Sequence, residues 1–328
     1  MQGILFLLAT LVGAACGDDF YGGGGGDADA DTDTDSDADS DADSDTDSCA
    51  AIDDGPFDLE RLTGPVAAED LAFDAEGNVV GSNGTSLFRS PIDGPPAVFA
   101  PIAQQAGLRY LPSGILVVAD DVEGDLYLVE PDGTSELLLA DLAYPNGIAI
   151  DLAGFVYLTE KSAGSVRRID PFHGDFVYVV SGGIAEPNGI TFDPSYRHLY
   201  IAGTSGEGII HRVSIAADGT PGDLEEWVSG VGRGRLDGLA VDVCGNVYVC
   251  DYGSGVGDGT LVYRISPDGE RARLISSSEG GEWTFLANMD WGTGIGGWST
   301  TSLYFAETSS QSIFEMDIGV PSKPRAYP

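Results

Sequence analysis

The sequence predicts an all-β fold, a six-bladed β-propeller of four-stranded antiparallel blades, on three observations. First, one pattern recurs: a polar residue and Gly, an apolar strand, an Asp-led turn, and a second strand of β-branched and aromatic residues. Second, its copies lie roughly 40 to 50 residues apart, which is typical of propeller blades. Third, no segment shows sustained helical periodicity. The clearest copy occupies residues 144–160, with others at 69–80, 188–201 and 237–249 and weaker ones at 106–118 and 287–305.

The six copies assign residues 56–328 to one propeller domain and divide it into blades in chain order. The expected blade boundaries lie near Gly64, Pro101, Asp141, Gly182, Val231 and Gly281. A closed ring leaves no unpaired strand edge, so a segment outside the six copies has to complete the last blade. We expect residues 57–62 to supply this outer strand, because the prolines after Val320 make residues 322–328 a poor ladder strand.

Residues 1–16 are expected to form a lipoprotein-type signal peptide. Residues 4–15 are an apolar run that is too short to span a bilayer and ends in small residues, as a secretory signal does. Residues 11–16 resemble a bacterial lipoprotein signal, in which Cys16 is the acylation site. We therefore expect an exported bacterial lipoprotein, held by its lipid at the outer membrane or cell surface, with the periplasmic side as an alternative. Cleavage without lipid attachment is the other outcome.

Residues 17–55 are expected to form a disordered linker rich in Gly and Asp. A run of glycines ends at Gly26, and a strict alternation of Asp with Ala, Thr or Ser follows. This alternation has no large apolar side chain whose burial could offset the entropy lost on ordering, and its neighbouring carboxylates repel one another. A weak Ca²⁺-binding tract is the alternative, although the Gly-rich nonapeptide of Ca²⁺-binding β-rolls is missing.

The charge of the chain excludes one class of partner. The formal net charge is −38, and binding to nucleic acid needs clustered Lys and Arg, which are absent here. We expect no nucleic-acid partner, a monomeric protein, and contact with a membrane only through the lipid.

The cysteines leave two arrangements open. Cys244 precedes a predicted strand and Cys250 lies near its far end, so about 20 Å separates them at ~3.3 Å per residue, which is beyond disulfide reach. Cys49 lies at the junction with the linker and can reach the outside of the ring, where Cys244 is its better partner. The alternative is three unpaired thiols, with Cys250 buried as a small apolar residue.

Four polar residues share one register of the repeat. Strand direction alternates in a blade, so the residue that opens each innermost strand lies at the mouth of the central channel, on the face opposite the Asp-led turns. In two blades this residue is Ala106 or Ala287, and in the other four it is Glu69, Asn146, Asn188 or Asp237. Two carboxylates and two amide oxygens would repel one another without a cation, and hard oxygen donors suit Ca²⁺, with Mg²⁺ or Mn²⁺ as alternatives. Each residue by itself is equally compatible with a turn or cap.

This pattern, with Glu in blade one, Asn in blades three and four and Asp-Gly in blade five, resembles the senescence-marker protein, gluconolactonase and luciferin-regenerating enzyme family. The resemblance runs from about Gly64 to the C-terminus. It implies a six-bladed propeller with an axial divalent cation, commonly Ca²⁺, and hydrolysis of lactones or esters. It also implies that Glu69, Asn188 and Asp237 are metal ligands and that Asn146 is a further polar position.

The paraoxonases are more distantly similar, since Asp70 beside Glu69 resembles their Glu-Asp pair. Their His dyad has no counterpart: His173 and His198 fall near turns expected on the opposite face, and His211 falls on a third strand. All three are expected to be structural or surface residues. No Arg matches the one that orients sugar-acid lactones in gluconolactonases, and Lys161 is its nearest substitute.

The leading hypothesis for function is a Ca²⁺-dependent hydrolase of small-molecule lactones or esters. The metal would polarise the acyl oxygen and activate water, while Asp237 would serve as ligand and catalytic base. Residues of the upper loops and the channel would then line the mouth and choose the substrate: Asp70, Asp120, Asp121, Glu160, Lys161, Glu207, Tyr252 and Glu307.

Two other functions remain open. One is a non-catalytic binding or scaffold propeller whose axial ion holds the blades together, since a fold does not imply an activity. The other is a condensation like that of strictosidine synthase, which needs a Glu base such as Glu160, Glu207 or Glu307.

Overall fold

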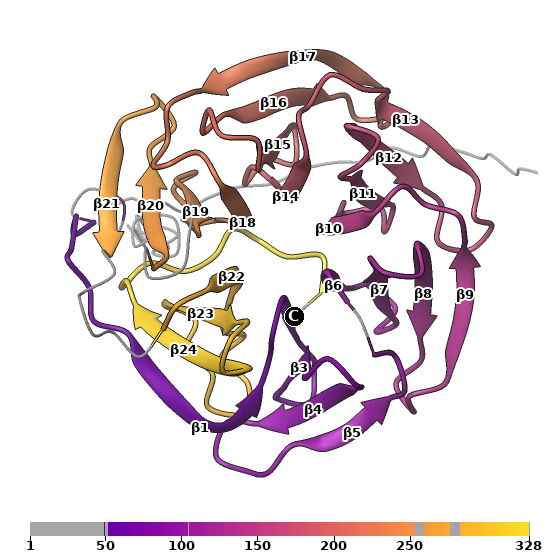
Figure 1. The fold of residues 1–328 in the computed structure, drawn as a ribbon, viewed down its shortest axis with the longest axis vertical. Helices are drawn as coiled ribbons and strands as arrows, with labels where there is room; N and C mark the ends of the chain where they lie inside the picture. Colours follow the sequence, from indigo (N-terminus) through magenta and orange to yellow (C-terminus); the bar gives the residue numbers. More distant parts are fainter. Residues whose placement is uncertain (1–48, 50–51, 104, 253–258, 276–282, 328) are drawn as a thin grey trace, which may run out of the picture. The chain divides into compact units, whose positions relative to one another are not determined.

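The computed structural model describes residues 49, 52–103, 105–252, 259–275 and 283–327. The chain divides into two units, residues 1–40 and residues 41–328, and only the second contains described residues. Its strands form six separate four-stranded antiparallel sheets arranged as blades around a central channel (Figure 1). The prediction of a six-bladed propeller is confirmed. The expected signal peptide with Cys16, and residues 17–48, 50 and 51 of the expected linker, lie outside the described residues.

Each blade runs from the channel outward in chain order. Blade one contains β2 (Leu71–Phe73), β3 (Asn78–Ser82), β4 (Leu87–Pro91) and β5 (Ala97–Ala100). Blade two contains β6 (Gly107–Tyr110), β7 (Leu116–Asp120), β8 (Asp125–Val129) and β9 (Ser135–Leu139). Blade three contains β10 (Pro145–Ile150), β11 (Val156–Glu160), β12 (Ser165–Ile169) and β13 (Phe176–Val180).

The other three blades repeat this order. Blade four contains β14 (Pro187–Phe192), β15 (His198–Gly203), β16 (Ile210–Ile215) and β17 (Pro221–Val228). Blade five contains β18 (Leu236–Val241), β19 (Val247–Asp251), β20 (Leu261–Ile265) and β21 (Arg271–Ile275). Blade six contains β22 (Leu286–Trp291), β23 (Ser302–Glu307), β24 (Ser312–Asp317) and, as its outer strand, β1 (Glu60–Val66).

The ring closes by pairing its two ends. β1 lies antiparallel to β24, with Arg61 opposite Phe314, and the Arg61 guanidinium donates to Ser312 Oγ at 2.7 Å. The expected closing strand is therefore present, but it starts at Glu60 and ends at Val66, later than the expected 57–62. Phe57 lies outside it and donates its backbone N–H to the carbonyl of Leu274 in blade five.

Asp-led turns connect the inner strand to the second strand on the face opposite the channel mouth. In blade one the Asp74 carboxylate accepts the backbone N–H groups of Glu76 and Asn78 at 3.0 and 2.8 Å. Asp151 does the same for Ala153 and Phe155, at 2.9 Å each. A carboxylate on a short side chain can accept backbone N–H groups of its own turn and so stabilise it, which explains why Asp recurs at this position.

Aromatic pairs join neighbouring blades in a repeated way. A Tyr of the second strand meets an aromatic residue of the next inner strand edge to face, at centroid separations of 5.4, 4.9 and 5.3 Å in Tyr304–Phe73, Tyr157–Phe192 and Tyr248–Trp291. Such pairs bury large apolar area in a favourable geometry. They fix the spacing of the inner strands that carry the candidate site.

The structure has one of the two cysteine arrangements that the sequence left open. Cys49 and Cys244 form a disulfide with their Cα atoms 5.6 Å apart, and Cys250 is a free, buried thiol. Within the described ranges, no helix is long and apolar enough to cross a membrane.

Candidate functional site

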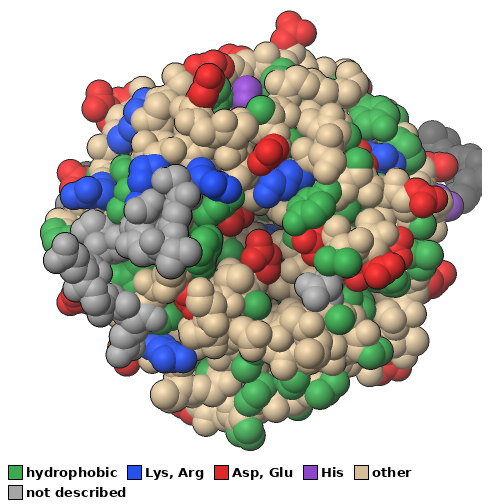
Figure 2. Space-filling model, viewed as in Figure 1, with side chains coloured by type: hydrophobic (Ala, Val, Ile, Leu, Met, Phe, Trp, Pro, Cys, Tyr) green, Lys and Arg blue, Asp and Glu red, His purple; other side chains and the backbone are tan. Residues whose placement is uncertain are grey.

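The channel mouth is the end where the inner strands begin, and the four predicted ligand residues lie there. Asn146 and Asn188 are the second residues of β10 and β14, Asp237 is the second residue of β18, and Glu69 comes two residues before β2. Three of these side chains are buried and that of Glu69 is half-buried. Figure 2 shows this face, with acidic side chains at its hollowed centre and basic side chains beside them.

A glycine after three of these residues lets the inner strands approach closely. A Cβ atom on Gly189 would lie 2.2 Å from the carbonyl oxygen of Asp237, and one on Gly147 would lie 2.3 Å from that of Asn188. Atoms that close overlap, so only glycine fits at these positions. The Asn-Gly and Asp-Gly pairs of the repeat therefore set the separation of the ligand residues around the channel.

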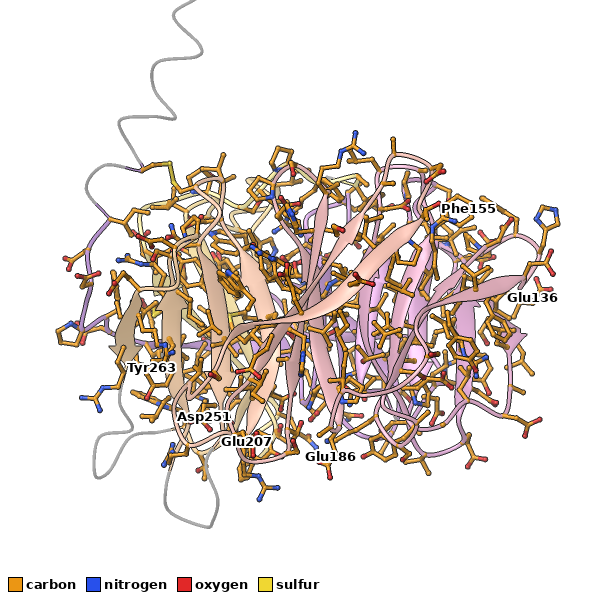
Figure 3. The ribbon with its side chains drawn as sticks, turned by 90° about the horizontal axis from the view of Figure 1, so that it is seen from above. Glu136, Phe155, Glu186, Glu207, Asp251 and Tyr263 are labelled. Atoms are coloured by element: carbon orange, nitrogen blue, oxygen red, sulfur yellow. A yellow bond between two sulfur atoms is a disulfide. The ribbon has the colours of Figure 1, made fainter. Side chains whose placement is uncertain are left out.

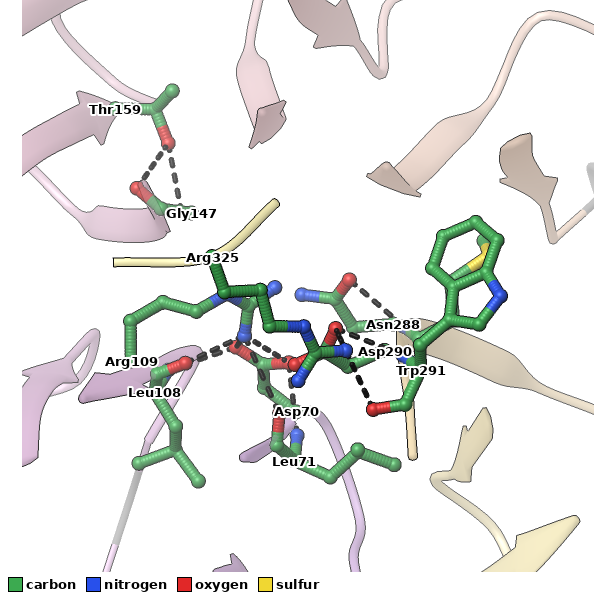
Figure 4. A network of polar contacts seen from close by, with 11 residues as sticks. Asp70, Leu71, Leu108, Arg109, Gly147, Thr159, Asn288, Asp290, Trp291 and Arg325 are labelled. Carbon is green, nitrogen blue, oxygen red and sulfur yellow. Dashed lines mark hydrogen bonds and ion pairs between the residues drawn. The ribbon is translucent and has the colours of Figure 1, made fainter. Parts of the chain in front are cut away.

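Blade one differs at the glycine position, because it carries Asp70. This carboxylate is fully buried and accepts the backbone N–H of Leu71 at 2.8 Å and that of Leu108, in blade two, at 2.7 Å. Arg109 Nη1 forms an ion pair with it at 2.9 Å (Figure 4). Asp70 thus links blades one and two inside the channel wall and does not line the exposed mouth, which corrects the expectation from sequence.

The electrostatics of the mouth favour a cation. Burial, followed by the nearby Asp237 and Asp121 carboxylates, raises the pKa of Glu69 to about 8. Burial also raises the pKa of Asp237 to about 7, against the opposing effect of the Lys161 charge. Neither carboxylate forms an ion pair with a Lys or Arg among the described residues. Two buried carboxylates that repel each other are stabilised by a shared counter-ion.

Hydrogen bonds orient the amide of Asn188. Its Nδ2 donates to Thr204 Oγ1 at 3.1 Å, and this hydroxyl in turn donates to the carbonyl of Leu236 at 3.2 Å. An amide whose nitrogen is held in this way is left with its oxygen as the group for a cation. Partners that orient a ligand in this manner are a general feature of metal sites.

The residues present fit a hard divalent cation. The described residues contain no group of three or more His, Cys, Asp and Glu side chains that could hold a metal. A metal at the mouth would therefore have to use the amide oxygens of Asn146 and Asn188 as well as the carboxylates of Glu69 and Asp237. A set with only oxygen donors suits Ca²⁺, and less well Mg²⁺ or Mn²⁺.

Three carboxylates expected to line the mouth instead hold loops together. Glu160 is fully buried, accepts the backbone N–H of Ala143 at 3.0 Å and forms an ion pair with Arg167 at 2.6 Å. Glu307 is also buried. It accepts the backbone N–H groups of Thr284 and Phe285, in the loop that enters β22 of the same blade. Hydrogen bonds of this kind hold the pKa of both Glu160 and Glu307 below its usual value despite burial.

The third of these carboxylates is Asp120, which lies at the end of β7 and is buried. It accepts the backbone N–H groups of Val122 and Glu123 within its own turn, at 3.1 and 3.0 Å. Its Oδ1 therefore shapes the turn, as the carboxylates of Glu160 and Glu307 fix loops.

Other expected mouth residues do lie around the opening. Asp121 raises the pKa of both Glu69 and Tyr144, so the three groups are close together. Tyr252 lies beside the mouth with Arg235 Nη2 donating to its hydroxyl at 3.2 Å, and the charge of Asp237 raises its pKa after burial. Glu207 is exposed on the same face as the mouth. Figure 3 shows it on the same side of the ring as Glu186, and Phe155 on the opposite side.

The C-terminal segment covers the other end of the channel, which the sequence did not predict. Residues 322–327 run across the centre of the ring (Figure 1) and enclose a cavity of about 110 Å³ with the inner strands. Lys323 Nζ donates to Thr191 Oγ1 at 2.9 Å and to the carbonyl of Phe192 at 2.8 Å. Arg325 Nη2 forms an ion pair with Asp290 at 2.9 Å (Figure 4).

The histidines lie where the sequence placed them, away from the mouth. The Nδ1 atoms of His173 and His198 lie 2.9 and 3.2 Å from the carboxylates of Asp170 and Asp193, beside turns of the opposite face. His211 is on β16, the third strand of blade four.

Comparison with known proteins bears on this site. Residues 157–284 match the family model described as SMP-30/Gluconolactonase/LRE-like region. The family resemblance is confirmed. A gluconolactonase of Zymomonas mobilis subsp. mobilis is 23% identical over 202 residues, which are 53% of this chain and 54% of that protein. The chain thus spans about half the length of this curated relative.

Solved structures share the fold over most of the chain. A gluconolactonase of Xanthomonas campestris is 20% identical, with a TM-score of 0.67 over 83% of this chain and 92% of that one. The calcium-binding protein regucalcin of Agrobacterium tumefaciens is 21% identical, with a TM-score of 0.64 over 83% and 97% of the two chains. A luciferin-regenerating enzyme is 14% identical, with a TM-score of 0.63 over 83% and 99%. At these identities the likeness concerns the fold alone.

Proposed function

We propose that this protein is a divalent-cation-dependent hydrolase of lactones or esters. The observation that carries the proposal is the placement of the half-buried Glu69, the buried Asp237 and two buried amide groups at the start of the inner strands, where the two carboxylates repel each other. The matching family model and the gluconolactonase relative support the same class of reaction. Regucalcin, described as calcium-binding, supports Ca²⁺ as the ion.

Glu69, Asn146, Asn188 and Asp237 would hold the ion through oxygen atoms. Bound there, it would polarise the acyl oxygen of the substrate and lower the pKa of a water. Ca²⁺ takes six to eight oxygen ligands, so four from the protein leave places for water and substrate.

Asp237 is the group that would move the proton. It lies at the floor of the mouth, where its carboxylate can accept the proton that the attacking water loses as the water oxygen bonds to the acyl carbon. The same proton can then pass to the alkoxide oxygen when the acyl–oxygen bond breaks. The Lys161 charge acts on Asp237 and would help to hold it as a carboxylate before the reaction.

The proposal is tested with the full chain and a panel of lactones and aryl esters, with Ca²⁺ and with EDTA. Turnover should require the ion, while circular dichroism shows that the protein stays folded without it. Asp237→Asn keeps a ligand oxygen and removes the base, so calorimetry should still detect Ca²⁺ binding while kcat falls by at least about 100-fold. Hydrolysis by Asp237→Asn at the parent rate would refute the role of Asp237. No turnover with any substrate would leave the non-catalytic propeller as the function.

We also propose that Cys16 is acylated and holds the protein at a membrane as an exported lipoprotein, because residues 11–16 resemble a lipoprotein signal. A Cys16→Ala variant should move from the membrane fraction to the soluble fraction while the propeller keeps its melting temperature. Membrane association that is unchanged in this variant would refute the lipid anchor.

A further inference from the structure

The cavity beneath the C-terminal segment gathers positive charge in an acidic protein. All six inner strands reach this cavity of about 110 Å³ with their last residues, and residues 322–327 cover it. The chain has 53 Asp and Glu residues against 15 Lys and Arg. Among the described residues that line the cavity, however, three are cationic and one is a carboxylate: Arg109 of β6, Lys323 and Arg325 of the C-terminal segment, and Asp290 of β22.

Arg109 has an unused edge at this cavity. Its Nη1 forms an ion pair with the Asp70 carboxylate at 2.9 Å and donates to the carbonyls of Leu71 and Leu108. Its Nε and Nη2 have no hydrogen-bond partner among the described residues, and both contact accessible space. These two nitrogens form one edge of the planar guanidinium, and such an edge can donate in parallel to two oxygens of one oxyanion.

Arg325 also keeps donors free. Its Nη2 donates to Asp290 at 2.9 Å and to the carbonyl of Trp291 at 2.6 Å, and within the described part of the chain its Nε and Nη1 have no partner (Figure 4). Against the effect of burial, the charges of Asp70 and then of Asp290 raise the pKa of Arg109. Asp290 is therefore close to both guanidinium groups, which places their free donors in the same part of the cavity.

Lys323 adds a third group of donors. Its Nζ donates to Thr191 Oγ1 and to the carbonyl of Phe192, at 2.9 and 2.8 Å. A protonated lysine has three N–H groups, so one is left over. In the described ranges no carboxylate forms an ion pair with this ammonium group.

The charges around the cavity do not balance. Asp70 is the counter-ion of Arg109 and Asp290 that of Arg325, which leaves the half-buried Lys323 as a positive charge without a counterpart. Burial lowers the pKa of Lys323 to about 7, against the opposing charge of Asp290. A charge removed from water without a counter-ion is costly, and an anion in the cavity would reduce this cost.

We propose that this cavity binds a small oxyanion, a carboxylate or a phosphate group, between the free edge of Arg109 and the Lys323 ammonium. One water-sized probe needs about 10–15 Å³, so the cavity has room for an anion of a few heavy atoms. The anion would join β6 of the ring to the C-terminal segment. The site lies at the end of the inner strands opposite the candidate metal ligands, and it does not depend on the proposed hydrolase function.

The test follows the melting temperature of the full chain in sodium acetate and in sodium phosphate at pH 6, below the Lys323 pKa of about 7. Sodium chloride at the same ionic strength is the reference. At about ten times its Kd, a bound oxyanion should raise the melting temperature about 2–5 °C above the chloride series. A response to acetate alone or to phosphate alone would support the site and identify which oxyanion it takes.

Two variants test the residues. Lys323→Gln removes the charge that has no counterpart, while Arg109→Lys keeps a charge beside Asp70 and removes the free edge. Each should raise the Kd for the oxyanion at least about tenfold, as calorimetric titration would show. Either variant is sufficient if the other does not fold.

Arg273→Gln is the matched control, since Arg273 is exposed on β21 and its replacement removes one positive charge away from the cavity. Its Kd should stay within about twofold of the parent. A melting temperature that rises no further in either oxyanion than in chloride would overturn the inference. Cavity variants that bind the oxyanion as the control does would overturn it as well, whether or not the protein hydrolyses lactones.

Discussion

At the scale of single residues, the proposed chemistry depends on two carboxylates at the channel mouth. Asp237 is buried and the nearby Glu69 is half-buried, and repulsion adds to the cost of removing these carboxylates from water. Asn146 and Asn188 add oxygen atoms without formal charge. The charged pair should therefore contribute more to the binding of a cation than the amide pair does.

A comparison of Glu69→Gln with Asn146→Ala tests this difference by calorimetric titration with Ca²⁺. We expect Glu69→Gln to raise the Kd for Ca²⁺ at least tenfold more than Asn146→Ala does, because it removes a charge from a partly desolvated channel. In EDTA at pH 9, above the pKa of about 8 of Glu69 and of about 7 of Asp237, both carboxylates are ionised, so Glu69→Gln should melt at a higher temperature than the parent because it removes their repulsion. Equal effects of the two variants on the Kd would show that charge does not dominate at this site.

At the scale of the strand, the glycine after each ligand decides how closely the inner strands approach. Gly189 lies on β14 where the neighbouring β18 carbonyl leaves no room for a Cβ atom. Blade one has Asp70 in place of this glycine. The Asp70 carboxylate accepts the backbone N–H of Leu108 on β6, the inner strand of blade two. The position of the candidate ligands is thus a consequence of strand packing.

Gly189→Ala should therefore harm both stability and the site. The added methyl forces β14 and β18 apart, which we expect to cost about 1–3 kcal/mol in the free energy of unfolding and to weaken Ca²⁺ binding. Urea unfolding and calorimetric titration measure the two effects. Ala217→Val adds methyl groups to an exposed turn and serves as the control. A Gly189→Ala protein with parental stability would contradict the close approach of these strands.

At the scale of the whole molecule, the ring is closed by strand pairing between chain segments that are far apart in sequence. β1 completes blade six, and the disulfide between Cys49 and Cys244 attaches the preceding segment to the β18–β19 turn of blade five. Propellers depend on such closure because an unpaired edge strand leaves backbone groups unsatisfied and invites association.

Removal of β1 tests the importance of closure. A protein that starts at Ala67 lacks β1 and should melt roughly 5–10 °C below the parent, as expected for the loss of a few kcal/mol in a domain of this size, and it should self-associate. A protein that starts at Cys49 keeps β1 and the disulfide and is the matched control. Differential scanning calorimetry and light scattering measure both properties, and equal melting temperatures would show that the ring does not need β1.

The sequence by itself determined the features that repeat. The blade count, the four-stranded blades, the turn aspartates and the register of Glu69 with Asp237 follow from a local pattern that each blade carries in full. Even the closing strand was predictable, because a closed ring requires one. These features depend on interactions between residues that are close in the sequence, so a short stretch of sequence is enough to predict them.

Tertiary structure alone decided the features that occur once. The pairing of Asp70 with Arg109, the loop-holding role of Glu160 and the covering of the channel by Lys323 and Arg325 have no repeating signal. Each depends on side chains that folding brings together from different strands, loops or blades.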